Sequence, residues 1–435
     1  MNSVFAIHLP GFVSGRLIYS LFHIGELCAY RTAVAAVFPA LLFFAGHVHD
    51  CRADIIFSAE AFPCSAGSSA APPMCEVHLF RANPDTGAET QVTSSREEMP
   101  SMFKGNLPLS ITNISPSVSS DGRLVAYASF RIFDDEGLRL SREWNGKPYY
   151  PQEEFYIYFY NYFPTRPYFT RHKSLNWNIY ETDLETGKET KISNFLWDEV
   201  EPQFLPRGSD ILYALKAEQS WFILRGPRSG KNFKQITLKD NQARRPQISP
   251  DGRELLYHSF RNDNWDIYML KMNDLPGGRV ETRLTATTYV NEVHPHWSPD
   301  GKKILFLSNP RRPRTSSFYD LCVMDLATGE RKYVTEKEGV NPDAVFSPDG
   351  ARIAYTVSEP GGHALYTVRT DGRDRRLIAV PEKNAAFPEW SPDGKRIAYL
   401  TGSGGACAVE VSNAGGGGAR PVSKRACVRA PMAWF

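Results

Sequence analysis

The chain has 435 residues, of which 42% are hydrophobic, so it can bury a large core. The formal net charge is +2 with both signs interspersed, which argues against a nucleic-acid partner. The sequence has no G-x-S-x-G motif, no complete P-loop and no dinucleotide-binding fingerprint, and therefore lacks the signals of several large enzyme classes.

Residues 1–53 are predicted to be an export signal or membrane anchor. No Asp, Glu, Lys or Arg occurs between residues 32 and 49. The apolar part, Thr32 to Gly46, is 15 residues long, whereas about 20 are needed to span a bilayer. A signal-peptide core therefore fits better, with cleavage between Gly46 and Ala53. An uncleaved anchor is the alternative, and we expect this segment to be the only contact with a membrane.

A turn motif recurs along the rest of the chain. In its clearest copy, Ser298-Pro299-Asp300-Gly301, the proline presets φ, the aspartate bonds locally and the glycine accepts a positive φ. Strand-like segments flank each copy. The turn glycines are Gly122, Gly208, Gly252, Gly301, Gly350 and Gly394. By subtraction their spacings are 86, 44, 49, 49 and 44, and a period of roughly 40–50 residues with several strands per unit indicates propeller blades.

We name the four predicted strands of a blade A to D. The first unit begins at Asp54 with a B-like strand, whereas the chain ends in an A-like strand at Trp434. We therefore predict an all-β, seven-bladed propeller over residues 54–435, in which N-terminal B, C and D strands pair with the C-terminal A strand. Such closure removes open sheet edges. Six or eight blades are the alternatives, since 86 is about twice 43.

An aromatic segment lies within that long spacing, and we interpret residues 131–175, approximately, as an insertion. Eleven of the 21 residues from Tyr149 to Phe169 are Phe or Tyr. These rings either pack on the propeller or form a surface for a partner or a sugar. The residues singled out are Tyr149, Tyr150, Phe155, Tyr158, Tyr160 and Tyr162.

One face of the predicted propeller is the better candidate for binding. The A–B and C–D turns share one face and are mostly tight, whereas the B–C and D–A loops share the other face and are longer. Binding residues concentrate on long loops of rigid scaffolds. Where strand A enters from this loop-rich face, polar residues should ring a channel mouth and could bind a polar ligand or a peptide carboxylate. The candidates are Glu201, Gln203, Arg245, Gln247, His294, His296 and Asp343.

No cofactor is expected, and a metal site has only weak candidates. His294 and His296 share one face of a strand, but a metal would need further ligands such as His258 or Gln247 from other strands. Clustering of the three histidines would favour an enzyme.

The chain has seven cysteines, and export would permit disulfides among them. We predict two disulfides, Cys64–Cys75 within a B–C loop and Cys407–Cys427 across a C–D pair. Cys322 lies in the middle of a strand and is expected to be a buried thiol.

The motifs WSPDG and IAY, each followed by a strand resembling DIY, are similar to the WD40-like repeats of the TolB family from about Asp54 to Phe435. The resemblance implies a periplasmic or envelope propeller that binds other proteins, in TolB a peptidoglycan-associated lipoprotein. We expect seven blades, whereas TolB has six, and no counterpart of its N-terminal α/β domain. Similar repeats form the propellers of prolyl-oligopeptidase-like hydrolases and of oligogalacturonate lyases, which use a His-rich metal site.

These observations favour a non-catalytic, exported propeller that binds a protein or peptide in the cell envelope through its loop-rich face. A metal-dependent carbohydrate lyase or hydrolase, with its site in the channel at His258, Gln247 and His294, is the first alternative. A carbohydrate-binding module that uses the aromatic insertion is the second.

Overall fold

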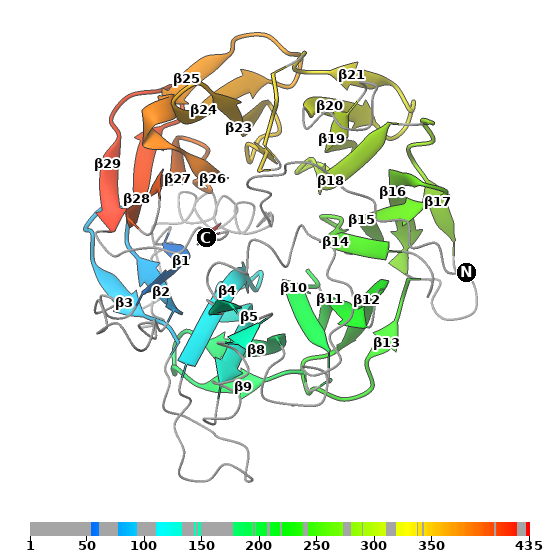
Figure 1. The fold of residues 1–435 in the computed structure, drawn as a ribbon, viewed down its shortest axis with the longest axis vertical. Helices are drawn as coiled ribbons and strands as arrows, with labels where there is room; N and C mark the ends of the chain where they lie inside the picture. Colours follow the sequence, from blue (N-terminus) through cyan, green and yellow to red (C-terminus); the bar gives the residue numbers. More distant parts are fainter. Residues whose placement is uncertain are drawn as a thin grey trace, which may run out of the picture.

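Seven blades form a ring around one axis (Figure 1). The structure is a computed structural model. It describes residues 54–60, 77–93, 110–132, 143–144, 147–148, 177–193, 195, 197–206, 209–217, 220–237, 242–272, 280–288, 290–309, 319–336, 338–341, 343–403, 406–423 and 432–435. Within this part, no helix has the length and apolar character needed to cross a membrane.

Each blade has four strands, which pair in the order A, B, C and D. Blade 1 comprises β30 (Ala433–Trp434), β1 (Ile55–Glu60), β2 (Val77–Ala82) and β3 (Glu89–Gln91). Blade 2 comprises β4 (Ser110–Val118), β5 (Leu124–Ile132), β8 (Trp177–Asp183) and β9 (Glu189–Lys191). Blade 3 comprises β10 (Asp198–Phe204), β11 (Asp210–Ala217), β12 (Ser220–Pro227) and β13 (Lys234–Gln235). Blade 4 comprises β14 (Gln242–Ile248), β15 (Glu254–Arg261), β16 (Asn264–Lys271) and β17 (Glu281–Arg283).

The remaining three blades follow the same order. Blade 5 comprises β18 (Asn291–Trp297), β19 (Lys303–Asn309), β20 (Asp320–Asp325) and β21 (Arg331–Tyr333). Blade 6 comprises β22 (Val345–Phe346), β23 (Arg352–Glu359), β24 (Gly362–Arg369) and β25 (Arg376–Ala379). Blade 7 comprises β26 (Ala386–Trp390), β27 (Arg396–Ser403), β28 (Ala406–Asn413) and β29 (Arg420–Ser423), and a 3-10 turn, η4 (Pro381–Lys383), precedes it.

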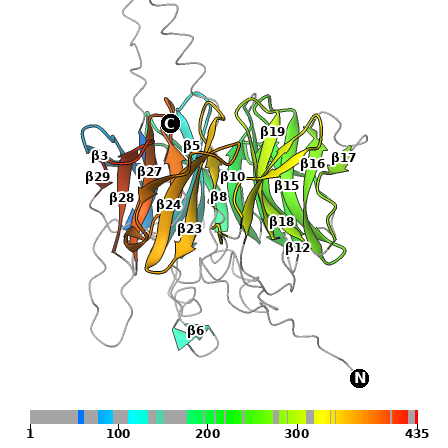
Figure 2. The ribbon, with the colours of Figure 1, turned by 90° about the horizontal axis from the view of Figure 1, so that it is seen from above.

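The structure confirms seven blades and explains the long glycine spacing. Strand β5 pairs directly with β8, with Leu124 opposite Asp183, so blade 2 holds an insertion between its B and C strands. Part of that insertion is a short hairpin of β6 (Glu143–Trp144) and β7 (Lys147–Pro148). Figure 2 shows β6 beyond the ring, on the side opposite the C-terminus.

The recurring turn is a structural device that joins neighbouring blades. In blade 5, Ser298 Oγ donates to Asp300 Oδ1 at 2.6 Å and accepts from the Lys303 amide at 2.9 Å. Gly301 has φ +69°, and the position of its missing Cβ lies 3.7 Å from Cδ of Pro250 in the preceding blade. Serine and aspartate make the same bond in the turns of blades 2, 4, 6 and 7.

The apolar core lies between the blades. The largest clusters of buried apolar side chains draw on neighbouring blades, such as the one shared by blades 5 and 6 around Phe346 and Leu307. Because each blade buries both faces against its neighbours, closing the ring also covers the apolar faces of the first and last blades. The aromatic position of the IAY motif in strand B is almost completely buried in every blade, as Phe57, Tyr127, Tyr213, Tyr257, Phe306, Tyr355 and Tyr399.

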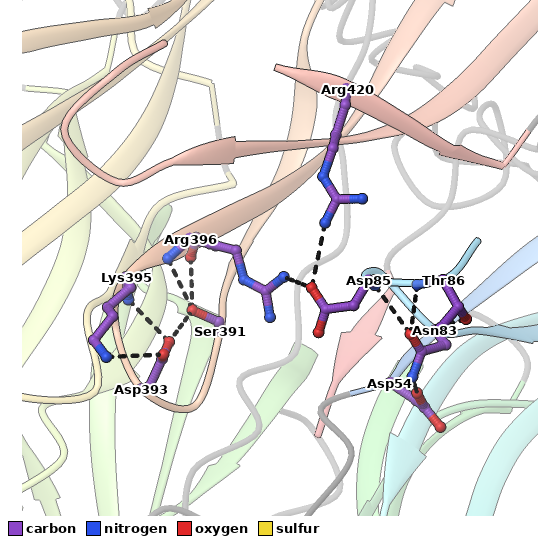
Figure 3. Close-up of polar contacts among 9 residues, drawn as sticks. All are labelled: Asp54, Asn83, Asp85, Thr86, Ser391, Asp393, Lys395, Arg396 and Arg420. Atoms are coloured by element: carbon purple, nitrogen blue, oxygen red, sulfur yellow. Dashed lines mark hydrogen bonds and ion pairs between the residues drawn. The ribbon is translucent and has the colours of Figure 1, made fainter. Parts of the chain in front are cut away.

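The predicted closure is confirmed. Strand β1 pairs with β30, so that Ile55 lies opposite Trp434, and the backbones of Asp54 and Phe435 exchange two hydrogen bonds of 2.8 and 3.0 Å. Polar contacts continue this seam at the surface (Figure 3). There Asp85 of blade 1 accepts hydrogen bonds from Arg396 and Arg420 of blade 7, at 2.5 and 3.3 Å.

Candidate functional site

Five A strands share one irregularity at the end where they enter from the loop-rich face. A β-bulge interrupts their pairing with strand B. One residue of each bulge has a positive φ although it is not glycine, and a proline follows it. A left-handed residue other than glycine costs about 1–2 kcal/mol, so its recurrence indicates that the ring requires this geometry. The residues are Ser115, Glu201, Arg245, His294 and Phe387.

Side chains near the bulges bond the backbone of the next blade. Glu201 Oε2 accepts from the Arg245 amide at 2.9 Å. Asp343 Oδ2 likewise accepts from the Phe387 amide, at 3.1 Å. These carboxylates are fully buried and fix the angle between blades, because a charged acceptor strengthens such a bond.

A histidine occupies the same role between blades 4 and 5. His258 of β15 lies opposite Arg244 of β14, and its Nδ1 accepts from the His294 amide at 3.1 Å. The rings of His258 and His294 have centroids 5.5 Å apart. Imidazoles and guanidinium groups therefore meet at the inner ends of blades 3 to 5, a region that we call the inner cluster. Its members are Glu201, Arg244, Arg245, His258, His294 and His296.

The members of the cluster include two cations and one anion. Arg245 Nε lies 3.7 Å and Arg244 Nη2 lies 4.0 Å from the same oxygen, Oε1 of Glu201. Burial, and then the charges of the two arginines, lower the pKa of His258 well below its usual value. Burial and the charge of Arg245 lower the pKa of His296 to about 3. The imidazoles are thus neutral at physiological pH and keep one nitrogen as donor and one as acceptor.

Hydrogen-bonding capacity is unused in the cluster. Nδ1 of His294, Nδ1 of His296 and Oε1 of Glu201 are buried, as is Nε2 of Gln247 on the strand that carries Arg245, and in the described part of the chain none of these atoms has a hydrogen-bond partner. His296 and Gln247 are each 3% exposed. A buried polar group without a partner costs about 1–3 kcal/mol, so these four atoms require an explanation.

Aromatic rings border the cluster on its loop-rich side. The Arg244 guanidinium carbon lies 4.5 Å from the centroid of the Trp221 ring, at the start of β12. The ring of Trp265, near the start of β16, lies 4.9 Å from that of His258 and 5.4 Å from that of Phe260. Phe260 is 37% exposed, so part of this aromatic border is accessible.

The structure gathers four of the predicted binding residues in the inner cluster, namely Glu201, Arg245, His294 and His296. Gln247 lies two residues after Arg245 on β14. The other two have bonds within the scaffold. Gln203 Oε1 accepts from the Ile248 amide of the next blade at 3.3 Å. Asp343 lies at the start of blade 6 and also accepts from Thr356 Oγ1 at 2.5 Å.

The three histidines lie together in the inner cluster, which is the arrangement expected of a metal-dependent enzyme. His258 and His294 lie side by side, but Nδ1 of His258 is occupied by the His294 amide. Among the residues that the structure describes, no three His, Cys, Asp or Glu side chains are placed to hold a metal ion.

Several predictions concern side chains that the structure does not describe. The aromatic candidates Tyr149 to Tyr162, the export segment and Cys64, Cys75 and Cys427 lie outside the described residues. Both disulfides therefore stay predictions, as does the role of the insertion. Cys322 is a buried free thiol, as expected.

Sequence reasoning missed Arg244, Trp221 and Trp265. Simple alternation places Arg244 and Arg245 on opposite faces of the strand, but the bulge brings both within 4.0 Å of Glu201. The aromatic residues that begin two successive C strands were the available signal, because strand ends of neighbouring blades meet on one face.

Comparison with known proteins identifies the repeat. Residues 166–310 and 268–431 match the TolB beta propeller domain, so that the two matches together extend from 166 to 431. The chain belongs to the TolB β-propeller domain family. This confirms the resemblance of the turn motifs.

Two Tol-Pal system TolB proteins are similar to this TolB-like propeller. That of Francisella tularensis subsp. mediasiatica is 26% identical over 219 residues, which are 49% of this chain and 48% of the relative. That of Alcanivorax borkumensis is 33% identical over 108 residues, covering 25% and 24%. The chain thus spans less than half the length of these relatives.

A solved structure supports the fold alone. The puromycin-hydrolyzing peptidase of Mycobacterium tuberculosis superposes with a TM-score of 0.55 at 11% identity, over 87% of this chain and 53% of that one.

Proposed function

We propose that this TolB-like propeller is an exported, non-catalytic protein that binds a protein or peptide in the cell envelope through its loop-rich face. Membership of the TolB propeller family supports a binding role, because the family resemblance implies an envelope propeller with protein partners. The apolar segment from Thr32 to Gly46 supports export.

The observation that carries the proposal is the unused hydrogen-bonding capacity of the inner cluster. The bonds between blades account for Oε2 of Glu201 and for the amides of Arg245 and His294. They do not account for the buried ring nitrogens of His294 and His296. Binding of a polar partner would satisfy these groups and recover part of their desolvation cost.

The proposal locates the partner on one face, and crosslinking can test this. Phe260 lies near the end of strand B of blade 4, on the loop-rich face, and Lys302 lies in the exposed tight turn of blade 5 on the opposite face. Each is replaced in turn by the photocrosslinker p-benzoylphenylalanine, and the variant is expressed in its native cell. We expect a discrete crosslinked protein from position 260 and none from position 302.

Equal products from the two positions, or a product from position 302 only, would contradict the assignment of the face. Phe260 suits the experiment because an aromatic replaces an aromatic at a partly exposed site. Cell fractionation after crosslinking tests export. The crosslinked product should be recovered in the envelope fraction, and a product found only in the cytosol would contradict export.

A further inference from the structure

We propose that the inner cluster binds a neutral carboxamide, the side chain of an asparagine or glutamine in an extended segment of the partner. This inference rests on the proposed function, since it specifies the chemistry of the partner that the loop-rich face binds. The carboxamide would pair with the buried atoms of the cluster that have no hydrogen-bond partner within the chain.

One of these atoms can only accept a hydrogen bond. Oε1 of Glu201 is buried and receives no hydrogen bond in the described part of the chain, whereas Oε2 accepts from the Arg245 amide. Arg245 Nε lies 3.7 Å from Oε1, which is an ion-pair distance but too long for a hydrogen bond. A ligand that satisfies Oε1 must therefore carry an N–H or O–H group. An ionised carboxylate only accepts, so it does not meet this requirement.

Two histidine nitrogens of the cluster can either donate or accept. Nδ1 of His294 and Nδ1 of His296 are buried, and neither has a hydrogen-bond partner among the described residues. Burial lowers the pKa of both imidazoles, so each ring is neutral at physiological pH and has one N–H and one bare nitrogen. Because no hydrogen bond to Nδ1 determines which nitrogen carries the proton, each Nδ1 can pair with a carbonyl or with an N–H of a ligand.

The charges around these atoms favour a ligand without net charge. Arg244 Nη2 lies 4.0 Å and Arg245 Nε lies 3.7 Å from Glu201 Oε1. After burial, the charges of these two arginines are the next causes that lower the pKa of His258, so a cationic ligand would be repelled there. An anionic ligand would be repelled by the Glu201 carboxylate. A carboxamide is neutral and has two N–H donors and one carbonyl acceptor, which match one acceptor and two adaptable nitrogens.

The border of the cluster favours a peptide as the carrier of the carboxamide. The ring of Trp265 lies 4.9 Å from that of His258 and 5.4 Å from that of Phe260, which is 37% exposed. His294 is half-buried and lies beside His258, so it connects this border with the buried members of the cluster. An extended chain can lay its backbone and apolar residues on the aromatic border while one polar side chain reaches inward.

Three peptides of equal length test this proposal. The fluorescein-labelled repeats Gly-Ser-Asn, Gly-Ser-Asp and Gly-Ser-Leu differ only in one side chain of nearly constant shape, which is an amide, a carboxylate or a hydrocarbon. Fluorescence anisotropy with the full chain gives the three dissociation constants. We expect the asparagine peptide to bind at least about tenfold more tightly than the other two, which corresponds to one or two net hydrogen bonds. Its affinity should not change with salt, because the asparagine side chain is uncharged.

One variant and one matched control localise the site. Glu201→Gln keeps an acceptor for the Arg245 amide but replaces the unpartnered acceptor by an N–H donor. Asp343→Asn makes the same chemical change in the carboxylate that accepts from the Phe387 amide, outside the inner cluster. We expect Glu201→Gln to bind the asparagine peptide about tenfold more weakly and the aspartate peptide more tightly, and Asp343→Asn to keep both constants within about twofold. A merely structural role of Glu201 would weaken the binding of both peptides.

Three results would overturn the inference. One is binding of the asparagine peptide to the unmodified chain that is no tighter than that of the leucine or aspartate peptide, which decides the matter even if a variant fails to fold. Another is an equal loss of affinity for the asparagine peptide in Glu201→Gln and Asp343→Asn. The third is binding of chitotriose, weakened in Glu201→Gln, without binding of the asparagine peptide, which assigns the site to a sugar. If the peptides fail while position 260 still crosslinks a protein, the proposed function stands and only the carboxamide site is wrong.

Discussion

The closure of the ring predicts a large effect of a single C-terminal side chain. Trp434 is 2% exposed, pairs with Ile55 of β1 and belongs to the apolar cluster shared by blades 1, 6 and 7. The Arg396 guanidinium carbon lies 5.3 Å from the centroid of its ring. Trp434→Ala therefore removes apolar contacts at the seam where the two ends of the chain meet.

The burial of Trp434 determines how much stability its truncation is expected to cost. Truncating a buried Trp or Phe to Ala costs about 3–5 kcal/mol, and proteins are stable by only about 5–15 kcal/mol. Loss of the seam also exposes the edge of β1, which would otherwise pair with β30. We expect Trp434→Ala to lower the free energy of unfolding by about 3–5 kcal/mol.

Urea unfolding followed by circular dichroism measures this change. Phe260→Ala is the matched control, because Phe260 is also aromatic but 37% exposed and lies far from the seam in sequence. Its loss should cost less than about 1 kcal/mol. If the two variants unfold at the same urea concentration, the C-terminal strand does not close the ring and the reasoning is refuted.

Three further predictions concern a buried acid, a turn and the thiols. Burial raises the pKa of Glu199 to about 8, so the folded state keeps a proton that the unfolded chain loses above pH 4.5, and stability falls as the pH rises toward 8. Glu199→Gln should reduce this pH-dependent loss of unfolding free energy, by at most about 4 kcal/mol between pH 5 and 8. If urea unfolding shows the same pH dependence in the variant, the prediction is wrong. Gly301→Ala should lower the free energy of unfolding by about 1–2 kcal/mol, because alanine must adopt a positive φ there. The added Cβ would lie 3.7 Å from Pro250, which is an ordinary contact, so no clash is expected. A decrease in melting temperature larger than that of a core truncation would show that a clash occurs. Thiol alkylation of the exported, non-reduced chain, followed by mass spectrometry, tests the cysteine assignments. Cys322 should be alkylated only after unfolding, because it is buried, and Cys64, Cys75, Cys407 and Cys427 should not be alkylated at all. Alkylation of these four cysteines would disprove the two disulfides.

The fold could be predicted because its determinants are local and repeated. A turn such as Ser298 to Gly301 needs a proline, an aspartate and a glycine at fixed places, and its spacing gives the blade. The incomplete first unit and the lone last strand then imply the pairing of Ile55 with Trp434. None of these inferences depends on knowing a contact between distant side chains.

The site was only partly predictable, because it depends on bulges and on contacts between blades. Arg245, His294 and His296 could be predicted because each lies one or three residues before the aromatic or aliphatic residue that ends strand A. In every blade these positions lie toward the inner end of the strand. It could not find Arg244, which a bulge turns toward Glu201. The sequence also could not show that Asp343 bonds within the scaffold, to the Phe387 amide and Thr356, whereas His294 and His296 keep ring nitrogens without a hydrogen-bond partner.

The most direct test combines the crosslinker with two charge variants. Arg244→Gln removes a charge from the inner cluster, and Arg253→Gln removes a charge from the tight turn at the other end of the same blade. Photocrosslinking from position 260 is quantified in the native cell for the otherwise unmodified chain, for Arg244→Gln and for Arg253→Gln, with equal amounts of folded protein. If the inner cluster of the loop-rich face binds the partner, the crosslinked product falls strongly in Arg244→Gln and is unchanged in Arg253→Gln. A product that is unchanged in both, or equally reduced in both, would contradict the account.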